Sequence, residues 1–333
     1  MTTSPEPKRI LAVIPCLNEQ AHIRELTESL VANNRDLALT IVIADGGSTD
    51  KTVEIAQELA TRHSNVVYLH NPKRIQSAAI NLAVATHGTE HSHLIRLDAH
   101  AAYPAGFCRL LLQEQASTGA ASVVVPMNTV GKEGFQKAVA AAQNSKLGNG
   151  GSAHRNVTGH GKWVEHGHHA LMTIAAFNSV GGYDESFSHN EDAELDLRLA
   201  AAGHRIWLTG LTALDYYPRS SPTALFRQYM RFGQGRAKTI LKHKIKPAPR
   251  QMAPAAVLPA FILWLLAPLW GILALPLLGW AGLCLAYGAW IAYKAKDPDL
   301  LLSGPAAMIM HAGWSVGFWR TILEKYLTPQ EAV

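Results

Sequence analysis

The stretch Thr40-Ile-Val-Ile-Ala-Asp-Gly-Gly-Ser-Thr-Asp50 decides the fold class of this 333-residue chain. Its first five residues are mostly β-branched and apolar, which predicts a buried strand, and the Gly-Gly pair after Asp45 predicts a tight turn. Two glycines let a ligand approach the backbone, and the Asp45 carboxylate can accept hydrogen bonds from a nucleotide base or a ribose. A Gly-Gly turn after a strand is often only a turn, so the rest of the chain has to decide between these interpretations.

Similar strand-like runs occur on both sides of this stretch, and helix-like segments separate them. Such alternation predicts an α/β fold with a mostly parallel sheet covered by helices. Ligands of such sheets bind beyond the carboxyl ends of the strands, where we expect both Asp45 and Asp98. The Gly-, Asn-, Ser- and His-rich segment Gly148–Gly161 is predicted to be a long loop near that site. The expected strands are Ile10–Ile14, Thr40–Ala44, Val66–Leu69, His93–Leu97 and Ala121–Met127.

The side chains of Arg96, Asp98 and His100 alternate along an extended segment and therefore share one side of it. A carboxylate together with an imidazole suits Mg²⁺ or Mn²⁺ that is held jointly with a diphosphate. The alternative is a strand-end aspartate beside a solvent-facing histidine. This triplet alone does not decide between the two.

Glu191 and Asp192 open a predicted helix after a long loop. A carboxylate in this position can be a charge that the helix dipole favours, or a general base that reaches an acceptor hydroxyl. The histidines before it do not have the spacing of a zinc site, so we assign them to structural roles or to an acceptor pocket. These histidines are His154, His160, His166, His168 and His169.

Met252–Tyr293 contains no charged residue, although charged residues make up 17 % of the chain. Because a membrane span needs about 20 residues, we predict two spans that turn near Gly271–Pro276. Basic residues flank both ends, which places both flanks on the cytoplasmic side. The apolar segment Leu300–Trp319 is interrupted by polar residues, and we expect it to be interfacial, re-entrant or a third span. A buried helical domain of a soluble protein is the alternative, but the uncharged stretch is long for a pair of core helices.

A basic segment precedes the apolar stretch. No Asp or Glu occurs between Asp215 and Asp297, and eight Lys and Arg residues crowd between Arg227 and Arg250. Anionic lipid attracts such a segment by about 1 kcal/mol per residue. A solvated helix face and nucleic-acid binding are alternatives, but the adjacent apolar run favours lipid, so we expect no nucleic-acid partner. The predicted organisation is a catalytic domain (1–215), a basic interfacial segment (216–250) and membrane-embedded helices (251–333).

Several classes of protein lose their support because their motifs are missing. The chain has neither GxGxxG nor GxxxxGK[ST], which argues against dinucleotide-binding and P-loop proteins. The three cysteines lie far apart without a CxxC pair, which argues against a zinc ribbon or a disulfide framework. Met1–Ile14 lacks the apolar core of a signal peptide.

Together and in this order, the motifs resemble those of the family 2 glycosyltransferases, which have a GT-A fold. The resemblance covers about residues 9–238, and within the family it extends to the bacterial exopolysaccharide transferases of the succinoglycan ExoA type. His100 stands where the family usually has Asp. Phe232 replaces a Trp, which argues against a processive polymer synthase. The matching motifs are Pro15-Cys-Leu-Asn-Glu19, Ala44-Asp-Gly-Gly-Ser-Thr-Asp50, Arg96-Leu-Asp-Ala-His100, Gly181-Gly-Tyr-Asp-Glu185, Asn190-Glu-Asp192 and Gln228-Tyr-Met-Arg-Phe232.

The resemblance implies an inverting, metal-dependent glycosyltransferase with a nucleotide-diphosphate sugar donor, UDP-linked in particular. It implies a lipid-linked acceptor at the bacterial inner (cytoplasmic) membrane, with the catalytic domain facing the cytoplasm. Asp98 and His100 would hold Mn²⁺ or Mg²⁺. The other roles are catalysis by Asp192 with Glu191, donor binding by Pro15, Glu19, Asp45, Arg74 and Asp98, and acceptor or diphosphate binding by Gln228, Arg231, Phe232 and His169.

Two other functions stay open at this point. A non-catalytic membrane subunit of a polysaccharide assembly complex would keep the fold, although the intact Asp98 and Asp192 speak against it. A sugar nucleotidyltransferase of related fold needs a phosphate-activating, Gly-rich loop with Arg or Lys near the N-terminus. The segment Pro15–Asn18 lacks these features.

Overall fold

The protein is described from a computed structural model, which covers residues 9–150, 159–247 and 249–327. The predicted loop at Gly148–Gly161 therefore lies partly outside the described residues. The chain forms two compact units. Unit 1 consists of Met1–Met127 and Asn156–Asp215, and unit 2 of Asn128–Arg155 and Tyr216–Val333. Residues 128–150, which the sequence analysis kept in the first domain, thus pack with the C-terminal helices.

Unit 1 is built on an eight-stranded sheet with the order β3-β2-β1-β4-β8-β5-β9-β7. Strands β3, β2, β1 and β4 run parallel to one another, whereas β8 runs antiparallel to both β4 and β5. The prediction of a mostly parallel α/β sheet is confirmed. The strands are β1 (Ile10–Cys16), β2 (Leu39–Asp45), β3 (Val66–His70), β4 (His93–Arg96), β5 (Ser122–Val125), β7 (Lys162–Val164), β8 (His168–Thr173) and β9 (Ile206–Leu208).

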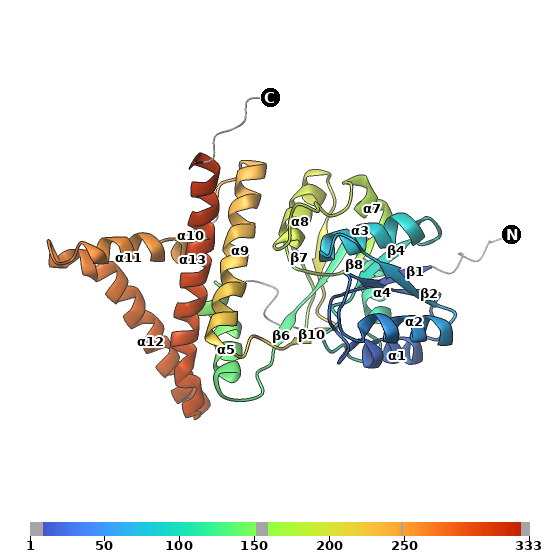
Figure 1. Ribbon diagram of the computed structural model, residues 1–333, viewed down its shortest axis with the longest axis horizontal. Coiled ribbons are helices and arrows are strands. Elements are labelled where there is room, and N and C mark those ends of the chain that lie inside the picture. The colour runs from blue at the N-terminus through green and yellow to red at the C-terminus, as the bar shows by residue number, and fades with distance from the viewer. Residues whose placement is uncertain (1–8, 151–158, 248, 328–333) are drawn as a thin grey trace. The chain divides into compact units, whose positions relative to one another are not determined.

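Helices cover both faces of this sheet, with α3 on one face and α1 and α2 on the other (Figure 1). The helix after the first strand begins at Ile23, because residues 17–20 are held in a loop by the neighbouring turn. The helices of unit 1 are α1 (Ile23–Asn33), α2 (Thr52–Arg62), α3 (Gln76–His87), α4 (Phe107–Thr118), α7 (Ile174–Ser179) and α8 (Glu191–Ala201).

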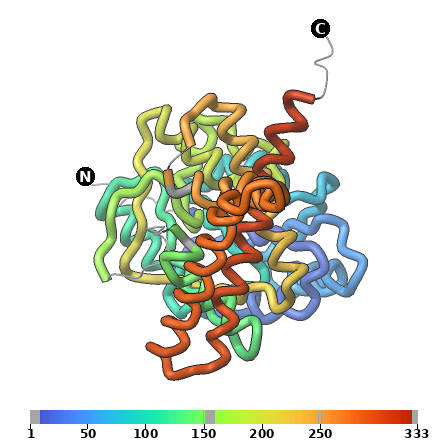
Figure 2. The backbone as a smooth tube through the Cα atoms, turned by 90° about the vertical axis from the view of Figure 1, so that its left-hand side faces the viewer, coloured from blue at the N-terminus to red at the C-terminus, as the bar shows by residue number. Residues whose placement is uncertain are grey.

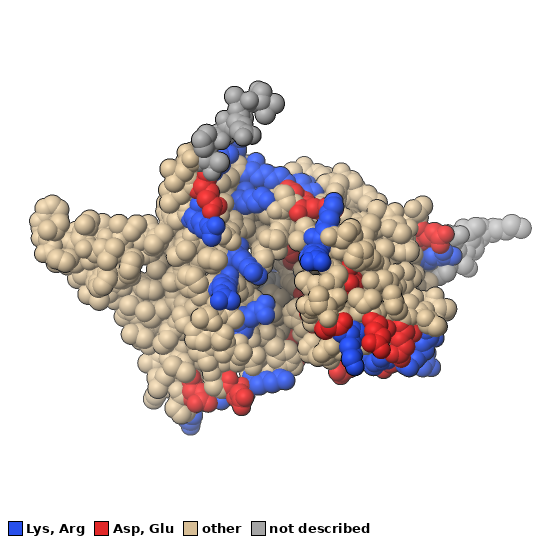
Figure 3. All heavy atoms as spheres, viewed as in Figure 1, with Lys and Arg blue, Asp and Glu red and all other residues tan. Residues whose placement is uncertain are grey.

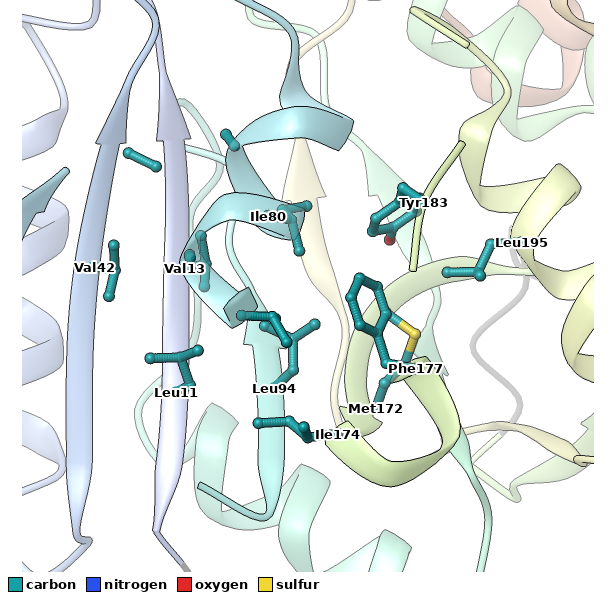
Figure 4. Packing of buried hydrophobic residues seen from close by; sticks show 14 of the residues in the cluster. Leu11, Val13, Val42, Ile80, Leu94, Met172, Ile174, Phe177, Tyr183 and Leu195 are labelled. Carbon is teal, nitrogen blue, oxygen red and sulfur yellow. The ribbon is translucent and has the colours of Figure 1, made fainter. Parts of the chain in front are cut away.

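One buried cluster ties the sheet to α3, α7 and α8 (Figure 4). Alternate side chains of β1 and β4, such as Val13 and Leu94, point to this face, as the period of two in a strand requires. Ile80 of α3 packs on them, and Leu195 anchors α8 to the same core. Since burial of one such side chain stabilises the fold by about 1.5–3 kcal/mol, the core fixes where the first turn of α8 lies.

Unit 2 is mostly helical. Its longest helices, α9 and α13, pack along each other, and α13 also packs on α5 and α12; Figure 2 shows α12 and α13 side by side. Strands β6 (Met127–Thr129) and β10 (Leu214–Tyr216) pair where the chain passes between the units. The helices are α5 (Gly134–Asn144), α6 (Lys146–Asn149), α9 (Pro222–His243), α10 (Pro249–Ala255), α11 (Val257–Leu265), α12 (Leu275–Ala295) and α13 (Ser303–Leu327).

The uncharged stretch differs from the prediction of two full spans. Among the described residues, one helical segment, Gly271–Ala295, is long and apolar enough to cross a membrane, and Met252–Leu265 is a shorter apolar one. Helix α11 has nine residues, or about 13 Å, because Pro254 lies within α10 before it and Pro268 follows it closely. Many large apolar side chains of this region are exposed, including Leu269, Trp270 and Leu283 at 71–73 %. Figure 3 shows no charged side chain over α11 and the turn into α12.

The segment Leu300–Trp319 lies mainly in α13, which is a continuous helix of 25 residues. Its small and apolar side chains pack inside unit 2, with Ala306, Ala307 and Met310 fully buried beside Leu225 of α9. The polar His311 is satisfied, since its ring nitrogens pair with Trp280 Nε1 and the Leu147 carbonyl. These contacts explain why polar residues are tolerated in an otherwise apolar segment.

Candidate active site

The carboxyl ends of β1 and β2 are joined into one structure by hydrogen bonds between their loops. Gly46 N donates to the Cys16 carbonyl at 2.9 Å, which continues the strand pairing into the turn. The Asn18 side-chain oxygen accepts from Thr49 N, and the backbone N–H of Asn18 donates to Ser48 Oγ, both at 2.8 Å. The motif that begins at Pro15 and the Gly-Gly turn therefore form a single edge, as their places at neighbouring strand ends predict.

Asp45 lies at this edge but is fully buried. Its carboxylate accepts hydrogen bonds from Gly47 N at 2.8 Å, from Ser48 N and from the Ser48 hydroxyl. Both carboxylate oxygens thus hold the turn in shape. A hydrogen bond that the Asp45 carboxylate accepts from a nucleotide stays a prediction. At this edge the chain presents the Gly-Gly turn, whose conformation the Asp45 carboxylate holds.

Arg74 follows β3 and approaches the same turn. Its backbone is left-handed (φ +59°), and its Cα lies 3.3 Å from the position that a Cβ on Gly46 would take. The Arg74 guanidinium lies 3.5–3.6 Å from the corresponding position on Gly47, whose φ is +80°. Gly46 therefore leaves space for the backbone of Arg74, whereas Gly47 is required by its left-handed φ. Its exposed side chain is available to an anion beside the turn.

Asp98 follows β4 and is held from several sides. Its Oδ1 accepts from Gln76 Nε2 at 2.9 Å, and its Oδ2 lies 3.5 Å from His168 Nε2. Burial alone raises the pKa of Asp98, but Arg96, His168 and His100 outweigh burial and lower it. Asp98 is therefore a carboxylate at neutral pH, and its side chain is 20 % exposed.

His100 lies two residues further along and is more exposed. Its Nδ1 is 3.0 Å from Glu19 Oε1, so the first and fourth strand ends meet through this pair. The structure describes no group of three or more His, Cys, Asp and Glu side chains that is arranged to hold a metal ion. A carboxylate and an imidazole are ligand types that suit an ion whose other ligands come from a diphosphate and water, so the assignment of Asp98 and His100 to such an ion stays a prediction.

The centre of the site is Arg96, a residue to which the sequence analysis gave no role. Its side chain is only 5 % exposed and makes an ion pair with Asp192 Oδ1. Its guanidinium also lies 3.5 Å from Asp98 Oδ1 and 3.6 Å from Glu191 Oε1. Burial alone lowers the pKa of Arg96, but the carboxylates raise it, so the side chain stays charged. One cation thus connects both acidic motifs.

Glu191 and Asp192 occupy the first turn of α8, after the left-handed Asn190 (φ +65°). Burial alone raises the pKa of Asp192, but Arg96, His169 and His168 outweigh it and lower the pKa. Burial and the neighbouring Asp192 raise the pKa of Glu191 to about 7. The surroundings therefore shift the pKa values of the two adjacent carboxyl groups in opposite directions and favour the ionised form of Asp192.

His169 lies in β8 and has no exposed surface. Its Nε2 is 2.8 Å from Asp196 Oδ1, and its Nδ1 is 2.6 Å from the Tyr183 hydroxyl and 3.4 Å from Asp192 Oδ1. It was predicted to bind the acceptor or diphosphate, but its described neighbours are these three side chains. The sequence analysis missed Asp196 and Tyr183. The i,i+4 spacing of Asp192 and Asp196, which puts both on one helix face, was the available signal.

The remaining predicted residues lie on α9 in unit 2. Gln228 Nε2 donates to the Tyr216 hydroxyl at 2.7 Å, and its buried Oε1 has no hydrogen-bond partner among the described residues. Arg231 is exposed, and Phe232 packs edge-to-face on Tyr229 with ring centroids 5.4 Å apart. Their proposed contacts with acceptor or diphosphate stay predictions.

Comparison with known sequences gives a consistent result. The profile described as "Glycosyl transferase family 2" matches residues 11–181. The chain is 56 % identical over 315 residues to "Succinoglycan biosynthesis protein ExoA" of Rhizobium meliloti (strain 1021), which covers 94 % of this chain and 95 % of that protein. It is 25 % identical over 248 residues to a dolichyl N-acetyl-alpha-D-glucosaminyl phosphate 3-beta-D-2,3-diacetamido-2,3-dideoxy-beta-D-glucuronosyltransferase of Methanococcus voltae, covering 70 % and 74 %.

Solved structures show the same fold at low sequence identity. A mannosyltransferase from Pyrobaculum calidifontis, in complex with GDP-Man and Mn²⁺, superposes with a TM-score of 0.62 at 19 % identity, covering 96 % of this chain and 89 % of that chain. GalNAc-T7 with UDP, GalNAc and Mn²⁺ superposes with a TM-score of 0.54 at 15 % identity, covering 77 % and 51 %. At these identities the likeness concerns the fold alone.

Proposed function

The chain belongs to glycosyl transferase family 2, and from this premise we propose that it transfers a sugar, with inversion, from a nucleotide-diphosphate donor to a lipid-linked acceptor. The acceptor is part of exopolysaccharide or related glycan synthesis, as the name of the ExoA relative suggests. The family assignment decides in favour of a glycosyltransferase and against a sugar nucleotidyltransferase or a non-catalytic subunit. The observation that carries the proposal is the ion pair of the partly buried Asp192 with Arg96, which also lies beside Asp98.

The donor binds along the carboxyl ends of β1 to β4. The loop from Pro15 to Glu19 and the turn after Asp45 seat the base and ribose, and the exposed Arg74 beside the turn neutralises diphosphate charge. A UDP-linked sugar is the proposed donor. Support comes from the fold, because solved structures of the same fold hold UDP in one case and GDP-Man in another.

Asp98 and His100 are proposed to hold a divalent ion, Mn²⁺ or Mg²⁺. Oxygen donors with an imidazole suit these ions, and the Asp98 carboxylate is ionised and partly exposed. Both structural neighbours contain Mn²⁺. When bound, such an ion neutralises the charge that develops on the departing diphosphate. Glu19 beside His100 fixes the position of the imidazole.

Asp192 is proposed to be the general base. An inverting transfer needs one base, which takes the proton from the acceptor hydroxyl as that oxygen attacks the anomeric carbon from the face opposite the diphosphate. The Asp192 carboxylate is ionised, is held by Arg96 and lies at the start of a helix whose core residues are buried. The neighbouring Glu191, with its raised pKa, is proposed to tune the charge around this base.

The enzyme is proposed to work at the cytoplasmic face of the bacterial inner membrane. The exposed apolar side chains of α11 and α12 suit lipid, and basic residues flank this region on both sides, which suits a cytoplasmic orientation of both ends. The contacts of Gln228, Arg231 and Phe232 with acceptor or diphosphate belong to the same proposal.

Inside-out vesicles of inner membrane test this function, because a nucleotide sugar does not cross a bilayer and reaches only the cytoplasmic face. Vesicles that contain the protein are expected to transfer label from a UDP-sugar, supplied with Mn²⁺, into solvent-extractable lipid. Vesicles without the protein are the control. Label that appears only in right-side-out vesicles, or no transfer from any UDP- or GDP-sugar, would contradict the proposal.

A further inference from the structure

A buried pair of opposite charges lies directly behind the proposed base. His169 and Asp196 are 0 % and 1 % exposed, and their side chains meet at 2.8 Å. Removal of two charged groups from water costs several kcal/mol, which their mutual attraction seldom repays in full. A function is therefore expected for such a pair. Among the residues that the structure describes, Asp192 is the only acidic neighbour on the other side of the His169 ring.

The three side chains form a line that ends at the base. Asp196 Oδ1 holds the Nε2 side of the His169 ring, and the opposite Nδ1 lies 3.4 Å from Asp192 Oδ1. Asp196 is fixed in turn, because its Oδ2 accepts from Gly167 N at 3.3 Å and lies 2.9 Å from His166 Nδ1. The Tyr183 hydroxyl at 2.6 Å completes the contacts of the ring. His169 consequently has one orientation.

The two oxygens of Asp192 differ as a result. Arg96 and His169 both contact Oδ1. Oδ2 makes no hydrogen bond with any residue in the described part of the chain, and His168 Nδ1 lies 4.0 Å from it. A carboxylate that is held through one oxygen presents the other in a fixed direction. Oδ2 is therefore the atom available to an acceptor hydroxyl.

We propose that His169, held by Asp196, is a positioning residue that acts together with Arg96 to hold Oδ1 of Asp192, so that Oδ2 faces the acceptor. The inference rests on the proposed role of Asp192 as the base. It gives His169 a role without contact to acceptor or diphosphate. Burial alone lowers the pKa of His169, but Asp196 and Asp192 outweigh it and raise the pKa, in agreement with a cation between two carboxylates.

Among the described residues, Arg96 of β4 contacts the same Oδ1, and His168 Nδ1 lies 4.0 Å from Oδ2. Asp98, Glu191 and Tyr183 add no positive charge. The titratable and charged groups that face Asp192 are Arg96, Asp98, His166, His168, His169, Tyr183 and Glu191.

His169→Gln and Asp196→Asn test the proposal in the full-length protein. Each is expected to lower kcat by roughly 10- to 100-fold, the range seen when a group that orients a metal ligand is removed, and to leave the donor KM unchanged. The double variant is expected to be no worse than the more severe single variant, because both residues act through one line of contacts. His22→Gln, at an exposed site outside this network, is the matched control.

The same substitutions in the Asp192→Asn background separate positioning from a general structural role. With the base removed, neither substitution is expected to lower the residual turnover further. A further drop of the same size there, or an unchanged kcat in folded variants, would overturn the proposal. If His169→Gln melts before the assay temperature, the isosteric Asp196→Asn decides. Wild-type turnover of Asp192→Asn alone would instead show that the base assignment has failed.

Discussion

Arg96 sits among three carboxylates that come from two distant parts of the chain. It makes an ion pair with Asp192 and lies within 3.6 Å of both Asp98 and Glu191. A buried guanidinium without partners would be costly, and so would a buried carboxylate cluster without a cation. Each side therefore stabilises the charge of the other. This mutual dependence is what brings the proposed metal ligand and the proposed base into one site.

The proposed metal role of Asp98 makes a prediction at the scale of one residue. Asp98→Asn keeps the size of the side chain and an oxygen that can accept from Gln76, but removes the charge that attracts a divalent ion. The increase in UDP affinity that Mn²⁺ produces in the wild type is expected to fall at least about tenfold, which is about 1.4 kcal/mol. Calorimetric titration of UDP with Mn²⁺ and with EDTA measures it.

The control for this experiment is Asp36→Asn. Asp36 is exposed and pairs with Arg109 on the surface, so the same chemical change is made away from the strand ends. This control should bind UDP like the wild type under both conditions. Mn²⁺-dependent binding that is unchanged in Asp98→Asn would remove Asp98 from the proposed metal site.

At this scale the sequence predicts residues better than it predicts their partners. Asp45, Asp98 and Asp192 stand out because each follows an apolar run or opens a helix. The burial of Asp45 was not predicted. It is possible because the backbone and hydroxyl of the following turn donate hydrogen bonds to the Asp45 carboxylate. The roles of Arg96, Tyr183 and Asp196 depend on contacts across β4, β8 and α8, which local patterns do not contain.

Among the elements, α8 shows how the core positions the site. Leu195 and Leu199 belong to the cluster that includes β1, β4 and α3, whereas Glu191 and Asp192 form the first turn of the same helix. The spacing of apolar residues therefore fixes the rotation of α8, and with it the direction in which Asp192 points. The same helix carries Asp196 one turn further on.

Helices α9 and α13 pack so closely that glycine is required at their contact. A Cβ on Gly317 would lie 1.9 Å from the Met230 carbonyl oxygen, and one on Gly313 would lie 2.6 Å from that of Phe226. Gly317→Ala must push the helices apart, so it is expected to destabilise unit 2 by about 1–3 kcal/mol. Thermal unfolding of the detergent-solubilised protein measures the effect.

Gly279→Ala on α12 is the matched control, because no atom lies within 4 Å of its Cβ position. In a helix interior this change is expected to be neutral or to stabilise by up to about 1 kcal/mol. Equal melting temperatures for Gly317→Ala and the wild type would show that α9 and α13 are not held at this distance.

Strands β1 to β5 of unit 1 were predicted, because each is a short apolar run, whereas β7 and β8 were not predicted. The C-terminal elements were predicted less well. Hydropathy does not register that prolines divide the first half of the uncharged stretch, so α11 is short where a full span was expected. The contacts of α13 with α9 and α5 depend on small residues. A hydropathy sum does not distinguish these small residues from larger apolar ones.

At the scale of the whole molecule, a family 2 glycosyltransferase fold is followed by helices with exposed apolar side chains. The chain contributes to its second unit from two separate segments, residues 128–155 and 216–333. The sequence contains no periodicity that assigns the first of these segments to unit 2. That assignment depends on contacts with helices far along the chain. Family membership and the membrane proposal both apply to the full chain.

The measurement that tests the central claim most directly is sugar transfer by Asp192→Asn in inside-out membrane vesicles. If Asp192 is the base, turnover into extractable lipid falls by roughly 10²–10⁴-fold, while Mn²⁺-dependent UDP binding by the purified variant stays at the wild-type level. Asp36→Asn, measured in parallel, keeps its activity. Transfer by Asp192→Asn at a rate close to that of the wild type would contradict the account.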